Sequence, residues 1–281
     1  MTVLPLTSEP GYRIDCTQYR LIARHRLGLL PFDSMRDAAC VSCAAHTVET
    51  PTLLVDPDHA HSCVRQKGTS IDQRHEVLKL LLARLLRSCG WHVEVEPRFP
   101  PRTESSVDAD TGAIVTTAVP PVDIHGDLLL IRDNQRLLLD VTVARPTCLT
   151  QLRRSAHTSA SVIPLAAASD AEKRKHRTYG AECAHHGWRL VPFALETYGA
   201  LGASARRFLE QVSAHSTDRS PSDFLAHATN LLSVALQVGN AHVASRGAAE
   251  LHLCEYRRGM SHLPQGASVR QPGIYQRSTV G

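Results

Sequence analysis

A single carboxylate interrupts one of the most apolar runs of the chain. Asp140 lies between Leu137-Leu138-Leu139 and Val141-Thr142-Val143, and this run is typical of a buried strand. A charge in the middle of such a strand is costly unless it is paired or binds a metal. The sequence therefore predicts a core strand that carries a functional acid. A purely structural, paired acid is the alternative.

A second acid precedes the neighbouring apolar run. Asp127 comes directly before Leu128-Leu129-Leu130 and stands thirteen residues ahead of Asp140. The intervening Asp133-Asn134-Gln135 is typical of a turn, so we expect the two runs to form a hairpin that sets the two carboxylates close together. Two alternatives stay open: Asp123 in place of Asp127, and Asp127 as a structural residue at the start of the hairpin.

A basic run lies within a helix that we expect over residues 166–186. The run reads Glu172-Lys173-Arg174-Lys175-His176-Arg177-Thr178-Tyr179. Two carboxylates with a nearby lysine are what a magnesium-dependent phosphodiester hydrolase needs. We expect Lys175 or Lys173 to orient the attacking water or to stabilise developing charge. The alternative for both lysines is a solvated helix face.

The carboxylates and one histidine complete this candidate site. Asp127 and Asp140 are the expected ligands of Mg²⁺ or Mn²⁺, since hard cations take one or two carboxylates together with substrate oxygens and water. His75, in an earlier helix, could approach the phosphate or the water from the other side. A structural or surface role is the alternative for His75.

The helix that contains His75 is expected over residues 71–89 and has the clearest periodicity. Apolar residues recur at positions i, i+1, i+4 and i+5: Val77, Leu78, Leu81, Leu82, Leu85 and Leu86. Four basic residues lie off this stripe: Arg74, Lys79, Arg84 and Arg87. Gly90 is typical of the residue that ends a helix.

The order of the other elements predicts an α/β fold. Strands are expected over residues 91–96, 122–131, 136–145 and 188–195, and further helices over 17–28, 203–215 and 222–245. Residues 97–121 are interpreted as a loop or a ragged hairpin, and residues 146–164 as a polar linker. Helices that alternate with strands in this way form layers on a sheet.

Cysteine and histidine gather in residues 36–68. A C-x2-C pattern is followed by an H-x3-C pattern, and the spacing predicts a closed, structural zinc site with four ligands: Cys40, Cys43, His59 and Cys63. His61 competes as the fourth ligand, and His46 is a weaker candidate. Small cysteines that merely pack are the alternative interpretation.

Composition sets wide limits on function. The hydrophobic fraction of 43% is ample for a core, and 31 Lys and Arg against 27 Asp and Glu leave a net charge of +4. That balance permits nucleic acid as a partner without requiring it. No apolar run approaches the ~20 residues of a membrane-spanning helix. The start of the chain predicts no signal peptide, so we expect reduced cysteines.

These motifs resemble the C-terminal region of non-LTR retrotransposon reverse transcriptase polyproteins. In that family a Cys-Cys-His-Cys zinc knuckle precedes a restriction-enzyme-like endonuclease of the PD-(D/E)xK type. The resemblance covers roughly residues 26–245. It includes Arg74-His75 at the start of a helix, and the run 191–199, which is similar to the strand that follows the catalytic helix of the family.

The resemblance implies a role for each candidate residue. Asp127 and Asp140 would be the first and second metal carboxylates, and Tyr179 would complete a lysine–tyrosine element with a lysine from residues 172–175. The family's lysine two positions after the second carboxylate is absent here, because Thr142 occupies that position. In addition, the proline expected before the first carboxylate is replaced by glycine.

The resemblance also divides the chain into five parts. These are an N-terminal segment (1–35), the zinc knuckle (36–68), a restriction-endonuclease-like mixed sheet flanked by helices (69–200), a C-terminal helical region (201–250) and a flexible tail (251–281).

The implied function is that of a metal-dependent DNA endonuclease, which nicks target DNA to prime reverse transcription. It would use catalytic Mg²⁺ or Mn²⁺ and structural Zn²⁺, and it would act in the nucleus because its substrate is DNA. Element RNA and a reverse transcriptase acting in trans are further partners that the resemblance leaves open. The alternatives are a catalytically inactive, zinc-containing nucleic-acid-binding module and a decayed retroelement fragment.

Overall fold

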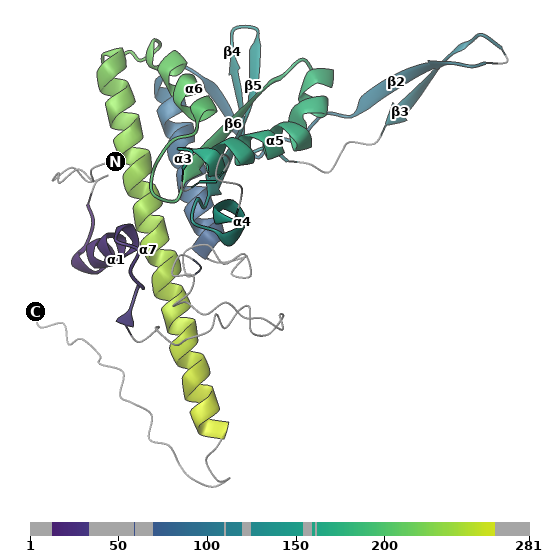
Figure 1. The fold of residues 1–281 in the computed structure, drawn as a ribbon. Coiled ribbons are helices and arrows are strands. Elements are labelled where there is room, and N and C mark those ends of the chain that lie inside the picture. The colour runs from purple at the N-terminus through teal and green to yellow at the C-terminus, as the bar shows by residue number, and fades with distance from the viewer. Residues whose placement is uncertain are drawn as a thin grey trace, which may run out of the picture.

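A four-stranded mixed sheet forms the centre of the protein. The structure, a computed structural model, describes residues 13–33, 59, 70–109, 111–119, 125–153, 159–160 and 162–261. The strand order is β1 (His92–Val95), β4 (Leu128–Arg132), β5 (Gln135–Ala144) and β6 (Arg189–Glu196). Strand β4 is antiparallel to both of its neighbours, β1 and β5, whereas β5 and β6 are parallel. Helices lie on both faces of the sheet (Figure 1), which confirms the predicted α/β class and is consistent with a restriction-endonuclease-like arrangement.

One face of the sheet is covered by α3 (Ser70–Ser88), α6 (Ala203–Ser213) and α7 (Pro221–Ser261). Leu82 of α3 packs in the same buried cluster as Leu139 and Phe193 of the sheet. Each apolar side chain of this size stabilises the fold by about 1.5–3 kcal/mol when fully buried. The main core of the protein therefore lies between α3, α6, α7 and this face.

The opposite face carries α5 (Ala166–His185). Successive strand residues point to opposite faces, so Leu138 and Asp140 of β5 face α5 while Leu139 faces α3. Alanines at the start of α5 pack against Ala144 and Ala194 of the sheet. These small side chains let the helix approach the strands closely, so that side chains from its next turns reach Asp140.

Two basic residues of α3 depart from the apolar periodicity of that helix. Arg74 and Lys79 lie off the stripe and are nevertheless buried, whereas Val77 lies on the stripe and is 53% exposed. Arg74 is buried because α7 packs alongside α3, and its Nη1 donates a hydrogen bond of 2.6 Å to Oδ1 of Asn240. Lys79 forms ion pairs at the other side of the helix. Helix periodicity alone does not reveal such polar partners.

The segment between β1 and β4 contains a two-stranded hairpin. It is formed by β2 (Arg102–Val107) and β3 (Ile114–Val119), which pair antiparallel. Of the two interpretations of residues 97–121, the hairpin is therefore the one observed. Figure 1 shows that this hairpin projects away from the central sheet.

The remaining elements lie at the periphery. Helix α1 (Cys16–Arg26) packs on α7, where Leu21 and Ile22 contact Ala241. A short α4 (Leu149–Leu152) lies within the expected linker. The last helix is longer than predicted: α7 continues to Ser261, into the segment that was expected to be a flexible tail. Among the described helices, none has the length and apolar character needed to cross a membrane.

Candidate active site

Asp127 and Asp140 stand at adjoining positions where the β4–β5 pairing ends. Leu128 of β4 pairs with Leu139 of β5, so the next residue outward on each strand is an aspartate. The Asp127 carboxylate lies against β5, because its Oδ2 accepts a hydrogen bond of 2.6 Å from the N–H of Val141. The hairpin therefore places both acids where the pairing of the two central strands ends, as their spacing predicts.

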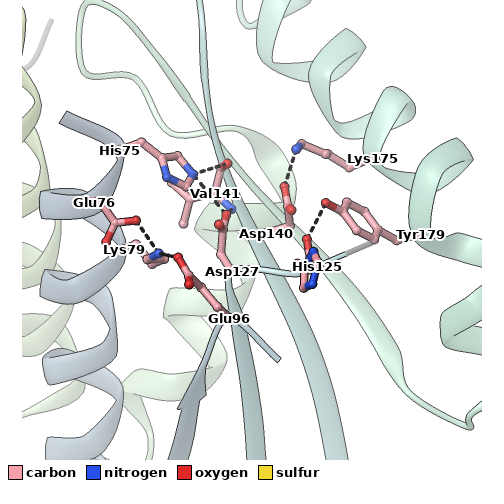
Figure 2. Close-up of polar contacts among 10 residues, drawn as sticks. All are labelled: His75, Glu76, Lys79, Glu96, His125, Asp127, Asp140, Val141, Lys175 and Tyr179. Atoms are coloured by element: carbon pink, nitrogen blue, oxygen red, sulfur yellow. Dashed lines mark hydrogen bonds and ion pairs between the residues drawn. The ribbon is translucent and has the colours of Figure 1, made fainter. Parts of the chain in front are cut away.

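His75 reaches Asp127 from α3. Its Nε2 lies 3.2 Å from Oδ2 of Asp127 and 3.2 Å from the carbonyl oxygen of Val141. The hydrogen bond to Asp127 raises the pKa of His75 above its ordinary value, and this effect outweighs the lowering caused by burial. His75 therefore helps to hold the first carboxylate against β5, as Figure 2 shows.

Asp140 is nearly inaccessible and faces α5. Its exposed fraction is 2%, and Nζ of Lys175 lies 2.6 Å from its Oδ2. Burial raises the pKa of Asp140, and the nearby charge of Asp127 raises it further, although Lys175 opposes both effects. The two carboxylates are thus close enough to repel each other, as expected for like charges that share a site.

The structure distinguishes between the two candidate lysines. Lys175 lies on the inner side of α5 at Asp140, whereas Lys173 is exposed. A helix turns by about 100° per residue, so two residues are separated by roughly 200° around the axis. Lys175 is therefore the lysine that the fold brings to the carboxylates, and Lys173 is not part of this cluster.

Tyr179 lies one turn after Lys175 on the same side of α5. Its hydroxyl donates a hydrogen bond of 3.0 Å to the carbonyl oxygen of His125, and the ring centroid lies 5.6 Å from Nζ of Lys175. Burial, together with the negative charge of Asp140, raises the pKa of Tyr179, so the phenol remains protonated at neutral pH. Tyr179 thus connects α5 to the segment that leads into Asp127.

Packing explains why glycine precedes Asp127. A Cβ atom at Gly126 would collide with Cδ1 of Leu138 on the adjacent strand. Any larger residue, including the proline of the related pattern, would therefore require the buried Leu138 side chain to shift. Glycine in place of proline at position 126 is therefore compatible with the observed position of Asp127.

The donor chemistry fits a hard divalent cation that is shared with substrate and water. Asp127 and Asp140 supply carboxylate oxygens whose mutual repulsion a cation would relieve. Both side-chain hydrogen bonds of Asp127 within the described part of the chain involve Oδ2. In the same part, no group of three or more His, Cys, Asp or Glu side chains is placed to hold a metal. Two protein carboxylates are, however, a common complement for Mg²⁺.

Sequence reasoning missed three residues beside Asp127. Lys79 of α3 pairs with Glu76 on the same helix and with Glu96 at the end of β1. The available signal was the four-residue separation of His75 and Lys79, which places both side chains on one side of a helix. Because Lys79 lies off the apolar stripe, periodicity indicated a surface residue instead.

Several predicted residues cannot be compared with the structure. The zinc candidates Cys40, Cys43 and Cys63 lie outside the described residues, as do the competing ligands His46 and His61. His59 is described alone, without those neighbours. Asp123, the alternative to Asp127, also lies outside the described ranges. The zinc knuckle therefore stays a prediction.

Comparison with known proteins gives one informative similarity. The chain is 24% identical over 156 residues to the "Retrotransposable element SLACS 132 kDa protein" of Trypanosoma brucei gambiense. This similarity supports a retroelement-related origin. The match covers 55% of this chain and 12% of the relative, so the chain spans only a small part of that protein. No family model matches.

Proposed function

We propose that this chain is a metal-dependent DNA endonuclease of the non-LTR retrotransposon type. The observation that carries the proposal is the convergence of Asp127 and Asp140, from adjoining strands, with Lys175 at 2.6 Å from Asp140. Two carboxylates and one lysine in such an arrangement are suited to phosphodiester hydrolysis. The similarity to a retrotransposable element protein supports the same proposal.

In this proposal Asp127 and Asp140 hold Mg²⁺ or Mn²⁺, which would polarise the scissile phosphate and activate water. The N–H of Val141 and the imidazole of His75 keep Asp127 in place. Lys175, beside Asp140, stabilises the negative charge that develops on the phosphate or orients the water. Tyr179 limits the position of Lys175 through its ring.

The outer side of α5 supplies a surface for the nucleic-acid backbone. Lys173, Arg174 and Arg177 are exposed there, and none has a carboxylate partner within the described residues. The three acids of the same helix are engaged elsewhere: Asp170 with Gln151, Glu172 with the N–H of Ser204, and Glu182 with His186. This side of α5 is therefore positively charged, which favours phosphate contacts.

The same surface supports a second candidate function, nucleic-acid binding without cleavage. Lys173, Arg174 and Arg177 would bind phosphate whether or not the carboxylates hold a metal. A catalytically inactive, zinc-containing binding module and a decayed retroelement fragment are both versions of this alternative. Binding that does not require a divalent cation, together with no cutting, would favour it over the endonuclease.

The experiment that tests the proposal is nicking of supercoiled plasmid in Mg²⁺ or Mn²⁺. We expect the wild type to cut and Asp140→Asn to be inactive. Asp133→Asn is the matched control, because Asp133 lies in the turn of the same hairpin with a side chain that is 91% exposed. No cutting by folded wild-type protein, with branched substrates included, would contradict the proposal.

The origin of the chain extends the proposal to its biological setting. Nicking of target DNA would supply the primer for reverse transcription, with a reverse transcriptase acting in trans and element RNA as the template. A nuclear location follows from the DNA substrate. Structural Zn²⁺ at Cys40, Cys43, His59 and Cys63 belongs to the same proposal. Co-purification of the chain with a reverse transcriptase and its RNA would test this setting.

A further inference from the structure

Among the described residues, Lys79 is one of the largest side chains that are almost completely buried. Only 1% of its side chain is exposed. An ammonium group in such a place is costly unless it is paired. Its two partners are Oε1 of Glu76 and Oε1 of Glu96, the latter at 2.6 Å. The Glu76 and Glu96 side chains are 47% and 65% exposed, so these two residues shield the ammonium group from solvent.

Glu96 has an unusual backbone conformation. Its φ is 53°, in the left-handed region, which costs a residue with a Cβ free energy and persists only when its surroundings enforce it. The ion pair with Lys79 ties the Glu96 side chain to α3. The N–H of Glu96 donates a hydrogen bond of 2.9 Å to the carbonyl oxygen of Asp127. Glu96 therefore connects Lys79 to the main chain of the first candidate metal ligand.

Helix α3 thus holds Asp127 at two points. His75 contacts the carboxylate directly, at 3.2 Å from Oδ2. Lys79, one turn later on the same helix, acts on the main chain through Glu96. Figure 2 shows the contact between His75 and Asp127 and the ion pair between Lys79 and Glu96. Because Lys79 is enclosed by its glutamates, it does not reach a substrate in this arrangement.

We propose that Lys79 is a positioning residue of the candidate active site. Its ion pair with Glu96 holds the left-handed backbone at the end of β1, and that backbone keeps Asp127 at the N–H of Val141. The inference rests on the proposed function only for the statement that the site is catalytic. The effect of Lys79 on the position of Asp127 does not depend on cleavage. The positioning role and the proposed endonuclease activity can therefore fail separately.

The first test follows the backbone amide of Val141 by NMR in ¹⁵N-labelled protein. This amide donates the 2.6 Å hydrogen bond to Asp127. We expect Lys79→Met, which keeps an unbranched side chain and removes the charge, to shift the Val141 resonance. It should also speed exchange of the Val141 amide by up to about tenfold, the effect of weakening one hydrogen bond. Arg84→Met, at an exposed position of the same helix, should leave the amide unchanged.

A second pair of variants tests the backbone step without altering the core. Glu96→Ala removes the ion pair and leaves a Cβ in the left-handed region, whereas Glu96→Gly removes the ion pair but adopts that region readily. We therefore expect the Val141 amide to change more in the alanine variant than in the glycine variant. These exposed substitutions decide the question if Lys79→Met does not fold.

Cleavage provides the third readout. A displacement of ~1 Å at the reacting groups can lower the rate by about 100-fold, so Lys79→Met and Glu96→Ala should cut more slowly than wild type by up to that factor. An unchanged Val141 amide in folded Lys79→Met and in Glu96→Ala would overturn the positioning role. If the amide responds while wild-type protein cuts no DNA, the positioning role stands and the proposed endonuclease fails.

Discussion

Nζ of Lys175 lies 2.6 Å from Oδ2 of Asp140, although one residue comes from a helix and the other from the middle of a strand. The pair exists because Asp140 faces α5 and because small alanines let that helix approach the sheet. The remaining candidate groups, Asp127 and His75, meet at the neighbouring position. This convergence leads to the predictions below.

Replacement of Lys175 should separate catalysis from binding. Lys175→Met removes the cation beside Asp140, and we expect the cleavage rate to fall by about 10²–10³-fold, as for loss of one charge-stabilising donor. Lys173→Met is the matched control, because Lys173 is exposed on the same helix. Its expected effect is confined to DNA affinity. Single-turnover nicking at saturating protein measures the difference, and equal loss in both variants would contradict the assignment of Lys175.

Ionised Asp140 should lower the free energy of unfolding at neutral pH. Burial raises the pKa of Asp140 above the ordinary value of 3.8, so the fold favours the protonated carboxyl. Its contribution to stability is fully present below pH 3.8 and is lost as pH rises through the raised pKa. Asp140→Asn, which mimics the neutral form, should therefore unfold at higher denaturant concentration at pH 7 than wild type. The stability difference between Asp140→Asn and wild type should shrink as the pH falls. If Asp140→Asn is less stable than wild type at pH 7, the prediction is wrong.

An NMR titration of His75 should reveal the effect of Asp127 on the pKa of this histidine. The hydrogen bond to Asp127 raises the pKa of His75 above 6.5. The stabilisation from protonated His75 is present below pH 6.5 and is lost as pH rises through the raised pKa. Asp127→Asn should lower the pKa of His75, whereas Asp133→Asn should not. A His75 titration that is identical in wild type and Asp127→Asn would argue against the contact.

The outer side of α5 should contribute to DNA affinity through phosphate contacts. The double substitution Arg174→Ala and Arg177→Ala should weaken binding to all sequences alike, and should reduce the slope of log K against log salt by about 0.9 per lost contact. Arg206→Ala serves as control, since Arg206 is exposed on α6 and pairs with Glu210. Fluorescence anisotropy at several salt concentrations gives both slopes. An unchanged slope in the double variant would remove α5 from the binding surface.

The predicted zinc knuckle is tested by metal content. Cys43→Ser should lower the amount of bound zinc and the thermal stability, because zinc binding contributes to folding of such modules. Cys16→Ser is the matched control, since Cys16 is an exposed free cysteine of α1. Elemental analysis of the purified proteins together with thermal unfolding makes the comparison. Equal zinc content in both variants would exclude Cys43 as a ligand.

Local pattern was sufficient for the elements that are strongly periodic or clearly bounded. Helix α3 begins and ends within one residue of its expected limits, and Gly90 follows it in the left-handed conformation. The β4–β5 hairpin forms around Asp133, which also has a positive φ. The end of α7 was missed, since this helix continues to Ser261, well beyond the expected limit at residue 245.

The sequence by itself determined that an acid would stand inside a buried strand, and that a second acid would meet it across a hairpin. Both follow from short-range spacing, which fixes strand register and the face of each side chain. Only the tertiary structure decided that Lys175 rather than Lys173 reaches Asp140, and that Lys79 lies inside the protein between Glu76 and Glu96. Those contacts depend on how α3 and α5 pack on the sheet. The partners are distant in the sequence, and neither periodicity nor charge indicates which side chains will meet.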